Sequence, residues 1–253
     1  MSYYAIVSLY LSRILNVQLR INIGENQGET KMLEELKEQV IKTARQAQRD
    51  GLCKHKSGNF SSRDKETGYV VITPSGVDRE LLTVDDMVVI DLDANVIECK
   101  SGLRPSSETL MHLKIYGLRP EVNSICHTHS LYATVFAVLN KPIPALVYEM
   151  MVMNCKQGRI PVAPYGRPGT TALADSVTDA CLEADTFLLQ GHGAVAVDAG
   201  PIEDAYLKAC YIEEFAELYQ HALTINGGKE PPAFPAEELQ AWAYPKEIHL
   251  LNQ

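Results

Sequence analysis

Three features that would point to particular classes of protein are missing from this 253-residue chain. No CxxC pair occurs among its six cysteines, whose scattered positions fit reduced thiols in a cytoplasmic protein rather than a disulfide scaffold. Basic residues are too few for a general nucleic-acid binder, because 23 lysines and arginines face 32 aspartates and glutamates, for a net charge of −9. A Gly-rich nucleotide fingerprint is also missing. The chain is nevertheless long enough to bury a substantial core without disulfides.

Long apolar runs are absent as well. Residues 3–19 are apolar in places, but Arg13 interrupts them, and no run reaches the about 20 residues that a membrane-spanning helix needs. The same stretch matches a secretory signal poorly, and Met32 opens an amphipathic segment that is a more natural domain start. We therefore predict that residues 1–31 are an N-terminal extension, an oligomer contact or a segment foreign to the native protein. Residues 32–230 would form the domain, and residues 231–253 a C-terminal tail.

Helical and strand patterns alternate along the chain. Apolar residues at helical spacing predict helices, and short apolar runs bounded by turn residues predict strands. This alternation favours an α/β fold, a single layered domain with a mixed sheet and helices on both faces. Helices are expected over residues 32–49, 107–116, 132–139, 171–183, 202–223 and 237–242, and strands over residues 69–72, 87–90, 95–98, 122–126, 186–190 and 194–197.

The most informative residues are histidines at the ends of predicted elements. His127 and His129 follow the strand expected over residues 122–126, and alternation along a strand places residues i and i+2 on the same face. His192 stands between two glycines, and Glu108 stands at a loop-to-helix junction. A single histidine is more often an isolated core or surface residue. Three imidazoles and a carboxylate together are a ligand set that zinc prefers, so the pattern predicts a metal site.

Three short polar loops carry glycine, serine, threonine and asparagine. Their backbone N–H groups, hydroxyls and amide could surround a phosphate without net basic charge. Taken singly, each loop is more often an ordinary turn or helix cap, so their value lies in accompanying the proposed metal ligands. The loops cover residues 57–62, 73–76 and 105–107.

Several motifs occur in the order in which the class II aldolase/adducin superfamily carries them. From about Met32 to Leu223 the chain resembles this superfamily, and within it most closely the L-fuculose-1-phosphate aldolases. The resemblance implies a three-layer α/β/α domain with a mixed, largely antiparallel central sheet, and a catalytic role for residues 32–230. The matching segments are Ser57-Gly58-Asn59, Thr73-Pro74-Ser75-Gly76, Pro105-Ser106-Ser107-Glu108, His127-Thr128-His129-Ser130, Ile143-Pro144-Ala145-Leu146-Val147-Tyr148 and Leu188-Leu189-Gln190-Gly191-His192-Gly193.

The resemblance also implies a role for each site residue. His127, His129 and His192 would bind Zn2+, and Glu108 would be the catalytic acid/base that can also approach the metal. Tyr148 would reach an active site across a subunit boundary of a homotetramer and help to protonate or orient the aldehyde oxygen. The phosphate would be held by Gly58, Asn59, Ser75, Gly76, Ser106 and Ser107.

The reaction implied is the reversible aldol cleavage of a ketose 1-phosphate, such as L-fuculose 1-phosphate, to dihydroxyacetone phosphate and an aldehyde such as L-lactaldehyde. Zinc would stabilise the negative charge that develops on the substrate oxygens, and Glu108 would move the proton, so no lysine Schiff base is needed. Desolvation of Glu108 would raise its pKa above the value of about 4.3 in water. Tyr244 is a weak counterpart of the family's C-terminal aromatic residue.

Other functions remain open at this point. An aldolase for 5-deoxy or methylthio pentulose 1-phosphates is one. An L-ribulose-5-phosphate 4-epimerase shares the metal and the retro-aldol chemistry, but Glu108 after two serines favours the aldolase. A methylthioribulose-1-phosphate dehydratase is favoured by Glu149, which stands where that branch carries its catalytic glutamate, although Glu108 with Tyr148 again favours the aldolase. An adducin-like binding module would lack the complete metal set that this chain retains.

Overall fold

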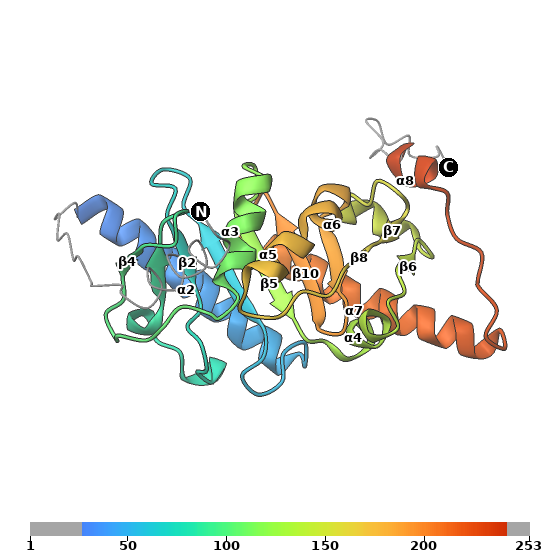
Figure 1. Ribbon diagram of the computed structural model, residues 1–253, viewed down its shortest axis with the longest axis horizontal. Coiled ribbons are helices and arrows are strands. Elements are labelled where there is room, and N and C mark those ends of the chain that lie inside the picture. Colours follow the sequence, from blue (N-terminus) through green and yellow to red (C-terminus); the bar gives the residue numbers. More distant parts are fainter. Residues whose placement is uncertain (1–26, 242–253) are drawn as a thin grey trace, which may run out of the picture.

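The computed structural model describes residues 27–241, with side chains from Leu33 onward. An eight-stranded sheet runs through the molecule in the order β4-β3-β2-β1-β5-β10-β9-β8 (Figure 1). Its neighbouring strands are antiparallel except for β8 and β9, which are parallel. The prediction of a mixed, largely antiparallel sheet is therefore confirmed. The strands of this sheet are β1 (Asn59–Arg63), β2 (Val70–Ile72), β3 (Val88–Ile90), β4 (Val96–Glu98), β5 (Ser124–Thr128), β8 (Val162–Ala163), β9 (Thr186–Leu189) and β10 (Gly193–Asp198).

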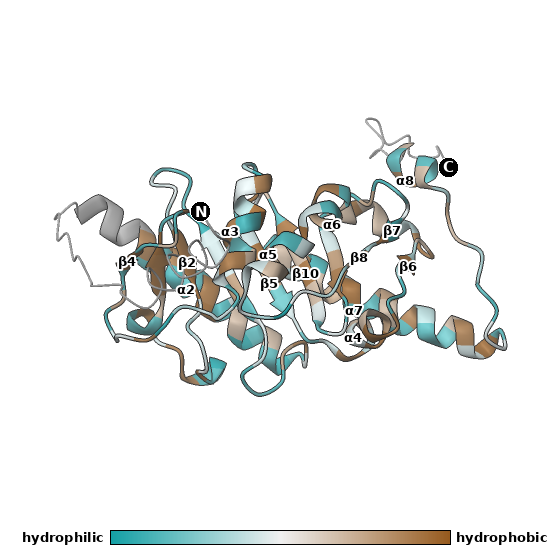
Figure 2. Ribbon diagram, viewed as in Figure 1, coloured by the Kyte–Doolittle hydropathy of each residue, from teal (hydrophilic) through white to brown (hydrophobic). Residues whose placement is uncertain are grey.

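Helices cover both faces of the sheet, and each face has its own core. Successive strand residues point to opposite sides, so Val71 lies in one core while its neighbours Val70 and Ile72 lie in the other. The core containing Val71 is closed by α2, α4 and α7, and the second core by α3, α5 and α6 (Figures 1 and 2). The three-layer α/β/α architecture is thus confirmed. The helices are α2 (Gln27–Arg49), α3 (Thr109–Leu118), α4 (Leu131–Val138), α5 (Thr171–Ser176), α6 (Thr178–Glu183) and α7 (Ile202–Ile225).

Three local predictions need correction. The segment 57–62 was expected to be a loop, but residues 59–63 form β1 at the centre of the sheet, where the buried hydroxyl of Ser61 has hydrogen-bond partners. Helix α2 begins at Gln27, before Met32, because an outer helical turn requires no apolar residue. The helix expected over 171–183 is two short helices that meet at Val177.

The end of the described chain packs against the region around residue 150. The part of the chain that the structure describes contains three short 3-10 helices: η1 (Arg79–Leu81), η2 (Val84–Asp86) and η3 (Tyr148–Met153). After α7 the chain turns back along the same end of the molecule to α8 (Ala236–Ala241), and on the way Phe234 N donates to Ala145 O at 2.7 Å (Figure 1). Leu239 of α8 is buried. Strands β6 (Ile143–Pro144) and β7 (Arg159–Ile160) form a separate two-stranded sheet nearby.

Other expectations concern the cysteines and the chain ends. All six cysteines are free thiols, as predicted. Within residues 27–241, none of the helices is both long enough and apolar enough to span a membrane. Tyr244 and most of the N-terminal segment 1–31 lie outside the described residues.

Candidate active site

The three histidines predicted as metal ligands converge at one end of β5. His127 and His129 come from the end of β5, and His192 from the turn between β9 and β10. Their ring centroids lie 4.8 Å from one another in each pairing. One potential ligand atom from each ring lies within 4.8 Å of the others. The structure therefore brings His192 next to His127 and His129, although His127 and His192 are 65 residues apart in the sequence.

Sheet pairing fixes the orientation of His127. Its Nδ1 lies 2.9 Å from the carbonyl oxygen of Ala194 on the neighbouring strand β10, an acceptor that requires Nδ1 to carry the hydrogen. In the neutral ring that a metal ion requires, the lone pair of His127 is on Nε2, which lies 3.0 Å from Nε2 of His129. A backbone carbonyl that holds the second nitrogen of an imidazole is the usual support of a metal-binding histidine.

Gly193 allows β10 to approach this site closely. A Cβ at this position would lie 2.3 Å from the carbonyl oxygen of Thr128 and 3.3 Å from Cε1 of His127. Any larger residue would push β10 away from β5. The glycine after His192 is therefore required by the same packing that places the histidines together.

Glu108 faces two of the three histidines. It stands immediately before α3, where its backbone N–H donates to Ser106 Oγ at 3.2 Å. Its Oε2 lies 3.0 Å from His127 Nε2, and its Oε1 lies 3.0 Å from His192 Nε2. Glu108 is buried, with 5% of its surface exposed. The predicted association of Glu108 with the histidine cluster thus corresponds to direct contacts.

The expected rise in the Glu108 pKa is not observed. Burial acts to raise the pKa of this carboxyl. In the metal-free chain, protonated His127 and His192 outweigh burial through their charge and their hydrogen bonds, and hold the pKa well below its ordinary value. The proximity of two imidazoles therefore matters more than the loss of water. Glu108 rests as a carboxylate, the form that can bind a cation or accept a proton.

The loops predicted to hold phosphate are adjacent to one another. Ser106 N donates to Thr73 O at 3.1 Å, and Ser75 N donates to Arg104 O at 3.0 Å, so the second and third loops are joined through their backbones. Phe60 N donates to Thr73 Oγ1 at 3.1 Å, which joins the first loop to the second. Of the predicted phosphate residues, Gly58, Asn59 and Ser106 are buried, and Ser75, Gly76 and Ser107 are exposed.

A buried arginine missed by the sequence analysis binds the first two loops together. Arg79 is 2% exposed, and its guanidinium donates to the carbonyl oxygens of Gly58 and Pro74. Its Nε has no hydrogen-bond partner among the described residues. Burial lowers the pKa of Arg79, against the opposing charges of Cys53 and Asp78. No repeat or motif distinguishes this arginine in the sequence, because its partners are all backbone carbonyls.

A second group, of which the sequence analysis identified only Asn59, lies behind Glu108. Asn59 Nδ2 donates to Glu108 Oε2 at 2.8 Å, and His112, Ser61 and Tyr116 continue the hydrogen bonds away from the cluster. His112 and Tyr116 follow Glu108 by four and eight residues, a spacing that places them on one face of a helix. That spacing was the available signal.

Tyr148 and Glu149 lie in η3 and make no hydrogen bond to the histidine cluster within the described residues. Tyr148 is 57% exposed, and Glu149 is partly exposed. Within residues 27–241 no hydrogen bond or ion pair joins either side chain to Glu108 or the histidines. An active site formed by one chain alone therefore lacks a contact with Tyr148.

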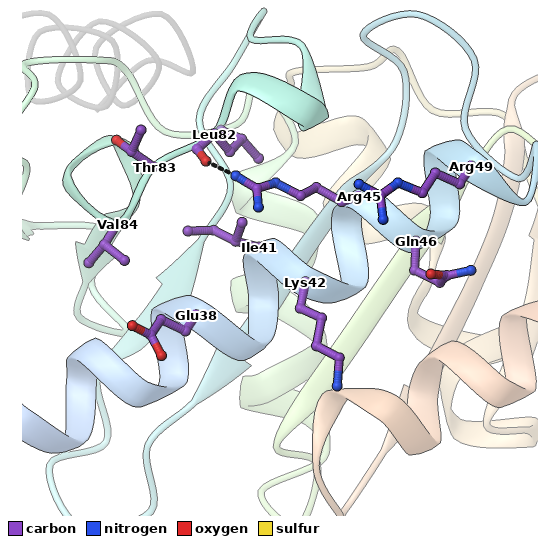
Figure 3. Close-up of a pocket in the computed structure, with 9 residues that line it drawn as sticks. All are labelled: Glu38, Ile41, Lys42, Arg45, Gln46, Arg49, Leu82, Thr83 and Val84. Carbon is purple, nitrogen blue, oxygen red and sulfur yellow. Dashed lines mark hydrogen bonds between the residues drawn. The ribbon is translucent and has the colours of Figure 1, made fainter.

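A separate hollow lies along α2. It has a volume of about 540 Å³ and is lined by Lys42, Arg45 and Arg49 of α2 and by the turn at Leu82–Val84 (Figure 3). Arg45 donates to Leu82 O at 2.6 Å across it. None of the site residues predicted from the sequence lines this hollow, so it is not the site of the histidine cluster.

The donor set fits a divalent cation with open coordination positions. Three imidazole nitrogens lie close together with a carboxylate beside two of them, and no lysine or arginine among residues 33–241 forms an ion pair with that carboxylate. Zinc in catalytic sites takes three protein nitrogen or oxygen ligands and leaves a position for water or substrate. Neutral nitrogen lone pairs held 3.0 Å apart repel unless a proton or a metal ion lies between them.

Comparison with known proteins agrees with this geometry. Residues 38–220 match the Class II Aldolase and Adducin N-terminal domain. The chain belongs to this family. Class II aldolases are metal-dependent enzymes, and this chain is a class II aldolase, as the resemblance in the sequence predicted.

Curated relatives and solved structures share most of the chain. A 5-methylthioribulose-1-phosphate/5-deoxyribulose-1-phosphate aldolase of Escherichia coli O45:K1 is 39% identical over 184 residues, which are 73% of this chain and 83% of that protein. An L-fuculose phosphate aldolase of Escherichia coli O6:H1 is 36% identical over 191 residues, 76% of this chain and 85% of that protein. The solved structure of an L-fuculose 1-phosphate aldolase has a TM-score of 0.74 and 34% identity, covering 81% of this chain and 93% of its own.

Proposed function

We propose that this class II aldolase cleaves a ketose 1-phosphate, of the L-fuculose 1-phosphate type, reversibly to dihydroxyacetone phosphate and an aldehyde such as L-lactaldehyde, with zinc as its metal. The observation that carries the proposal is the contact of one carboxylate, Glu108, with both His127 and His192 at 3.0 Å. The carboxylate that would move the proton then lies beside the histidines that would hold the charge-stabilising metal ion. The adjacent polar loops supply donors for a phosphate.

His127, His129 and His192 would hold the zinc ion, with Glu108 as a further or alternative ligand. The bound ion supplies Lewis-acid stabilisation of the negative charge on the substrate's oxygens. The remaining chemistry belongs to the chain. Burial of His127, at 0% exposure, and of Glu108 limits the access of water to the reacting atoms.

In the cleavage direction the bond between C3 and C4 of the ketose breaks, and the C4 hydroxyl loses its proton as the aldehyde forms. The electron pair of that bond passes to the C2 carbonyl, which gives an enediolate of dihydroxyacetone phosphate. Glu108 returns a proton to C3, and in condensation it removes this proton. Tyr148 would exchange the proton of the aldehyde oxygen. The phosphate would be held by Gly58, Asn59, Ser75, Gly76, Ser106 and Ser107.

A second substrate class is supported by the relatives. The relative at 39% identity is named for 5-methylthioribulose 1-phosphate and 5-deoxyribulose 1-phosphate, and a relative from Bacillus thuringiensis at 33% identity over 209 residues is named a 5-deoxy-D-ribulose 1-phosphate aldolase. Like L-fuculose 1-phosphate, these substrates are ketose 1-phosphates with hydroxyls at C3 and C4, and they differ from it in the aldehyde released. Glu149, beside Tyr148 in η3, is the residue to compare between the two classes.

Tyr148 would complete the site of a neighbouring subunit in a homotetramer, which we place in the cytoplasm because all six thiols are free. Support for an assembly comes from α4, whose exposed apolar side chains Leu131, Val135 and Val138 share one face. Mass measurement in solution tests this directly. A homotetramer that Val138→Asp dissociates is expected, whereas Leu81→Asp, at an equally exposed apolar residue on η1, should leave the mass unchanged.

Substrate profiling tests the proposal. Purified protein loaded with zinc should release dihydroxyacetone phosphate from L-fuculose 1-phosphate or 5-deoxyribulose 1-phosphate. Formation of an epimer from L-ribulose 5-phosphate, or of a dehydrated ketone from methylthioribulose 1-phosphate, without release of dihydroxyacetone phosphate, would identify the chain as an epimerase or a dehydratase instead. Absence of any conversion together with absence of bound metal would identify an adducin-like binding module.

A further inference from the structure

A chain of four buried hydrogen bonds leads from the proposed acid/base into the core between the sheet and α3. Asn59 Nδ2 lies 2.8 Å from Glu108 Oε2, and Asn59 Oδ1 lies 2.6 Å from His112 Nε2. His112 Nδ1 lies 2.7 Å from Ser61 Oγ, which lies 2.8 Å from the Tyr116 hydroxyl. His112 and Ser61 are 0% exposed, and Tyr116 is 1% exposed. Water cannot replace these partners without opening the core.

The donors and acceptors of this chain allow one direction only. An ionised Glu108 can only accept, so the NH2 group of Asn59 must face it and the amide oxygen must face His112. His112 then donates from Nε2, which leaves the lone pair on Nδ1 to accept from the Ser61 hydroxyl. Ser61 has one hydrogen, and it is used on His112, so Tyr116 donates to Ser61. Every hydrogen bond is satisfied in a single tautomer of His112.

The reverse direction fails at the carboxylate. If His112 carried its hydrogen on Nδ1, its Nε2 lone pair would require the NH2 group of Asn59. The amide oxygen of Asn59 would then face Glu108 Oε2 at 2.8 Å, two acceptors without a hydrogen between them. A buried contact of this kind costs far more than the hydrogen bond it replaces. The tautomer of His112 and the orientation of Asn59 are therefore one linked choice.

His112 also stays neutral. Burial, together with the charge of His127 and against that of Glu108, lowers the pKa of His112 to about 3. A neutral imidazole has one donor and one acceptor nitrogen, which matches the needs of Asn59 and Ser61.

We propose that His112 is a positioning residue of this aldolase, which, buried as the Nε2–H tautomer beside Ser61 and Tyr116, orients the Asn59 amide so that it donates to Glu108. The inference rests on the proposed function and deepens it, because Asn59 is also a proposed phosphate residue. The Asn59 NH2 group has two hydrogens. One is committed to Glu108, and the second is available to the phosphate, so the same amide connects phosphate binding with the acid/base.

The tautomer is tested by nitrogen NMR of the full-length chain labelled with 15N-histidine, both metal-free and loaded with zinc. The signals of His112 among the seven histidines are assigned by their loss in His112→Gln. A neutral ring with the hydrogen on Nε2 is expected. Ser61→Ala and Tyr116→Phe should both keep the Nε2–H form, because ionised Glu108 still requires the NH2 group of Asn59. Glu108→Gln, whose amide can donate or accept, should allow both tautomers. A charged ring or an Nδ1–H tautomer in the wild-type chain overturns the proposal. This measurement requires no activity, so it remains decisive if the proposed reaction is wrong.

Kinetics separate positioning from packing. Glutamine places an N–H where His112 carries Nε2–H, whereas asparagine places it where Nδ1 stands. His112→Asn and His112→Leu should lower kcat on the order of 10- to 100-fold with zinc content unchanged, and His112→Gln should recover most of this loss. Equal kcat values in folded Gln, Asn and Leu variants overturn the proposal. If the Asn and Leu variants do not fold, His112→Met, which is close in size to glutamine but has no N–H, takes their place, and a kcat equal to that of the Gln variant counts against the proposal.

Discussion

The Nε2 atoms of His127 and His129 lie 3.0 Å apart, with the other nitrogen of His127 held by the carbonyl of Ala194. Burial, followed by the charges of His127 and His192, lowers the pKa of His129 to about 3 against the opposing charge of Glu108, so its ring is neutral near pH 7. Two imidazoles whose Nε2 atoms face one another in this way can bind one cation together, whereas a proton on each would place two N–H groups against one another.

Loss of one ligand should therefore reduce the metal content of the protein. His129→Ala is expected to lower bound zinc from about one per chain to a small fraction, because two histidines and a carboxylate bind less tightly than three and a carboxylate. Elemental analysis of purified protein gives the occupancy. His221→Ala, which replaces a histidine with a 62% exposed side chain on α7, is the matched control and should retain its zinc. Equal zinc content in the two variants would exclude His129 as a ligand.

Glu108→Gln should separate catalysis from folding. The amide keeps the size of the side chain but cannot accept or return the proton, so kcat should fall on the order of 10² to 10⁴-fold. Thermal unfolding and far-ultraviolet circular dichroism should show a folded protein. Glu230→Gln alters an exposed carboxylate bonded to Lys141 and should keep full activity. Wild-type turnover in Glu108→Gln would show that another group moves the proton.

Two glycines with the same backbone conformation should respond differently to alanine. Gly58 has φ of +74° and Gly76 has φ of +75°, so alanine at either position costs about 1 to 2 kcal/mol in backbone strain. A Cβ at Gly58 would also lie 2.3 Å from Cys53 Sγ and 2.7 Å from His127 O, whereas one at Gly76 meets nothing within 4 Å. In urea unfolding, Gly58→Ala should therefore lose at least about 2 kcal/mol more than Gly76→Ala. Equal losses would show that the strand end beside Gly58 is looser than described.

The stability of the metal-free protein should fall in acid partly because of His112. Its pKa is about 3 in the folded chain and about 6.5 when unfolded, so between these values the unfolded state binds a proton that the folded state does not. This histidine contributes fully above about pH 6.5 and loses about 1.4 kcal/mol per unit as the pH falls toward 3. Urea titrations at several pH values should show a slope for His112→Gln that is smaller by about one proton. An unchanged slope would mean that His112 is charged in the folded state.

The sequence predicts the parts of this molecule that repeat a local pattern. Alternation placed His127 and His129 on one side of β5, and the apolar spacing of residues 202–223 located α7 closely. It does not predict β1, because Ser61 and Ser62 are polar, and the burial of Ser61 depends on partners distant in the chain, His112 and Tyr116. The direction of the Glu108 pKa shift was predicted wrongly for the same reason. Burial of the carboxyl could be inferred from the sequence, but the two imidazoles that face it could not.

The release of dihydroxyacetone phosphate from a ketose 1-phosphate is the most direct test of the proposed reaction. Zinc-loaded protein incubated with L-fuculose 1-phosphate, and separately with 5-deoxyribulose 1-phosphate, should give dihydroxyacetone phosphate and the matching aldehyde in equal amounts from at least one of them. The activity should disappear on removal of the metal and return with zinc. Fully zinc-occupied, folded protein that leaves both substrates uncleaved, or undiminished cleavage after the metal has been removed, would contradict the account.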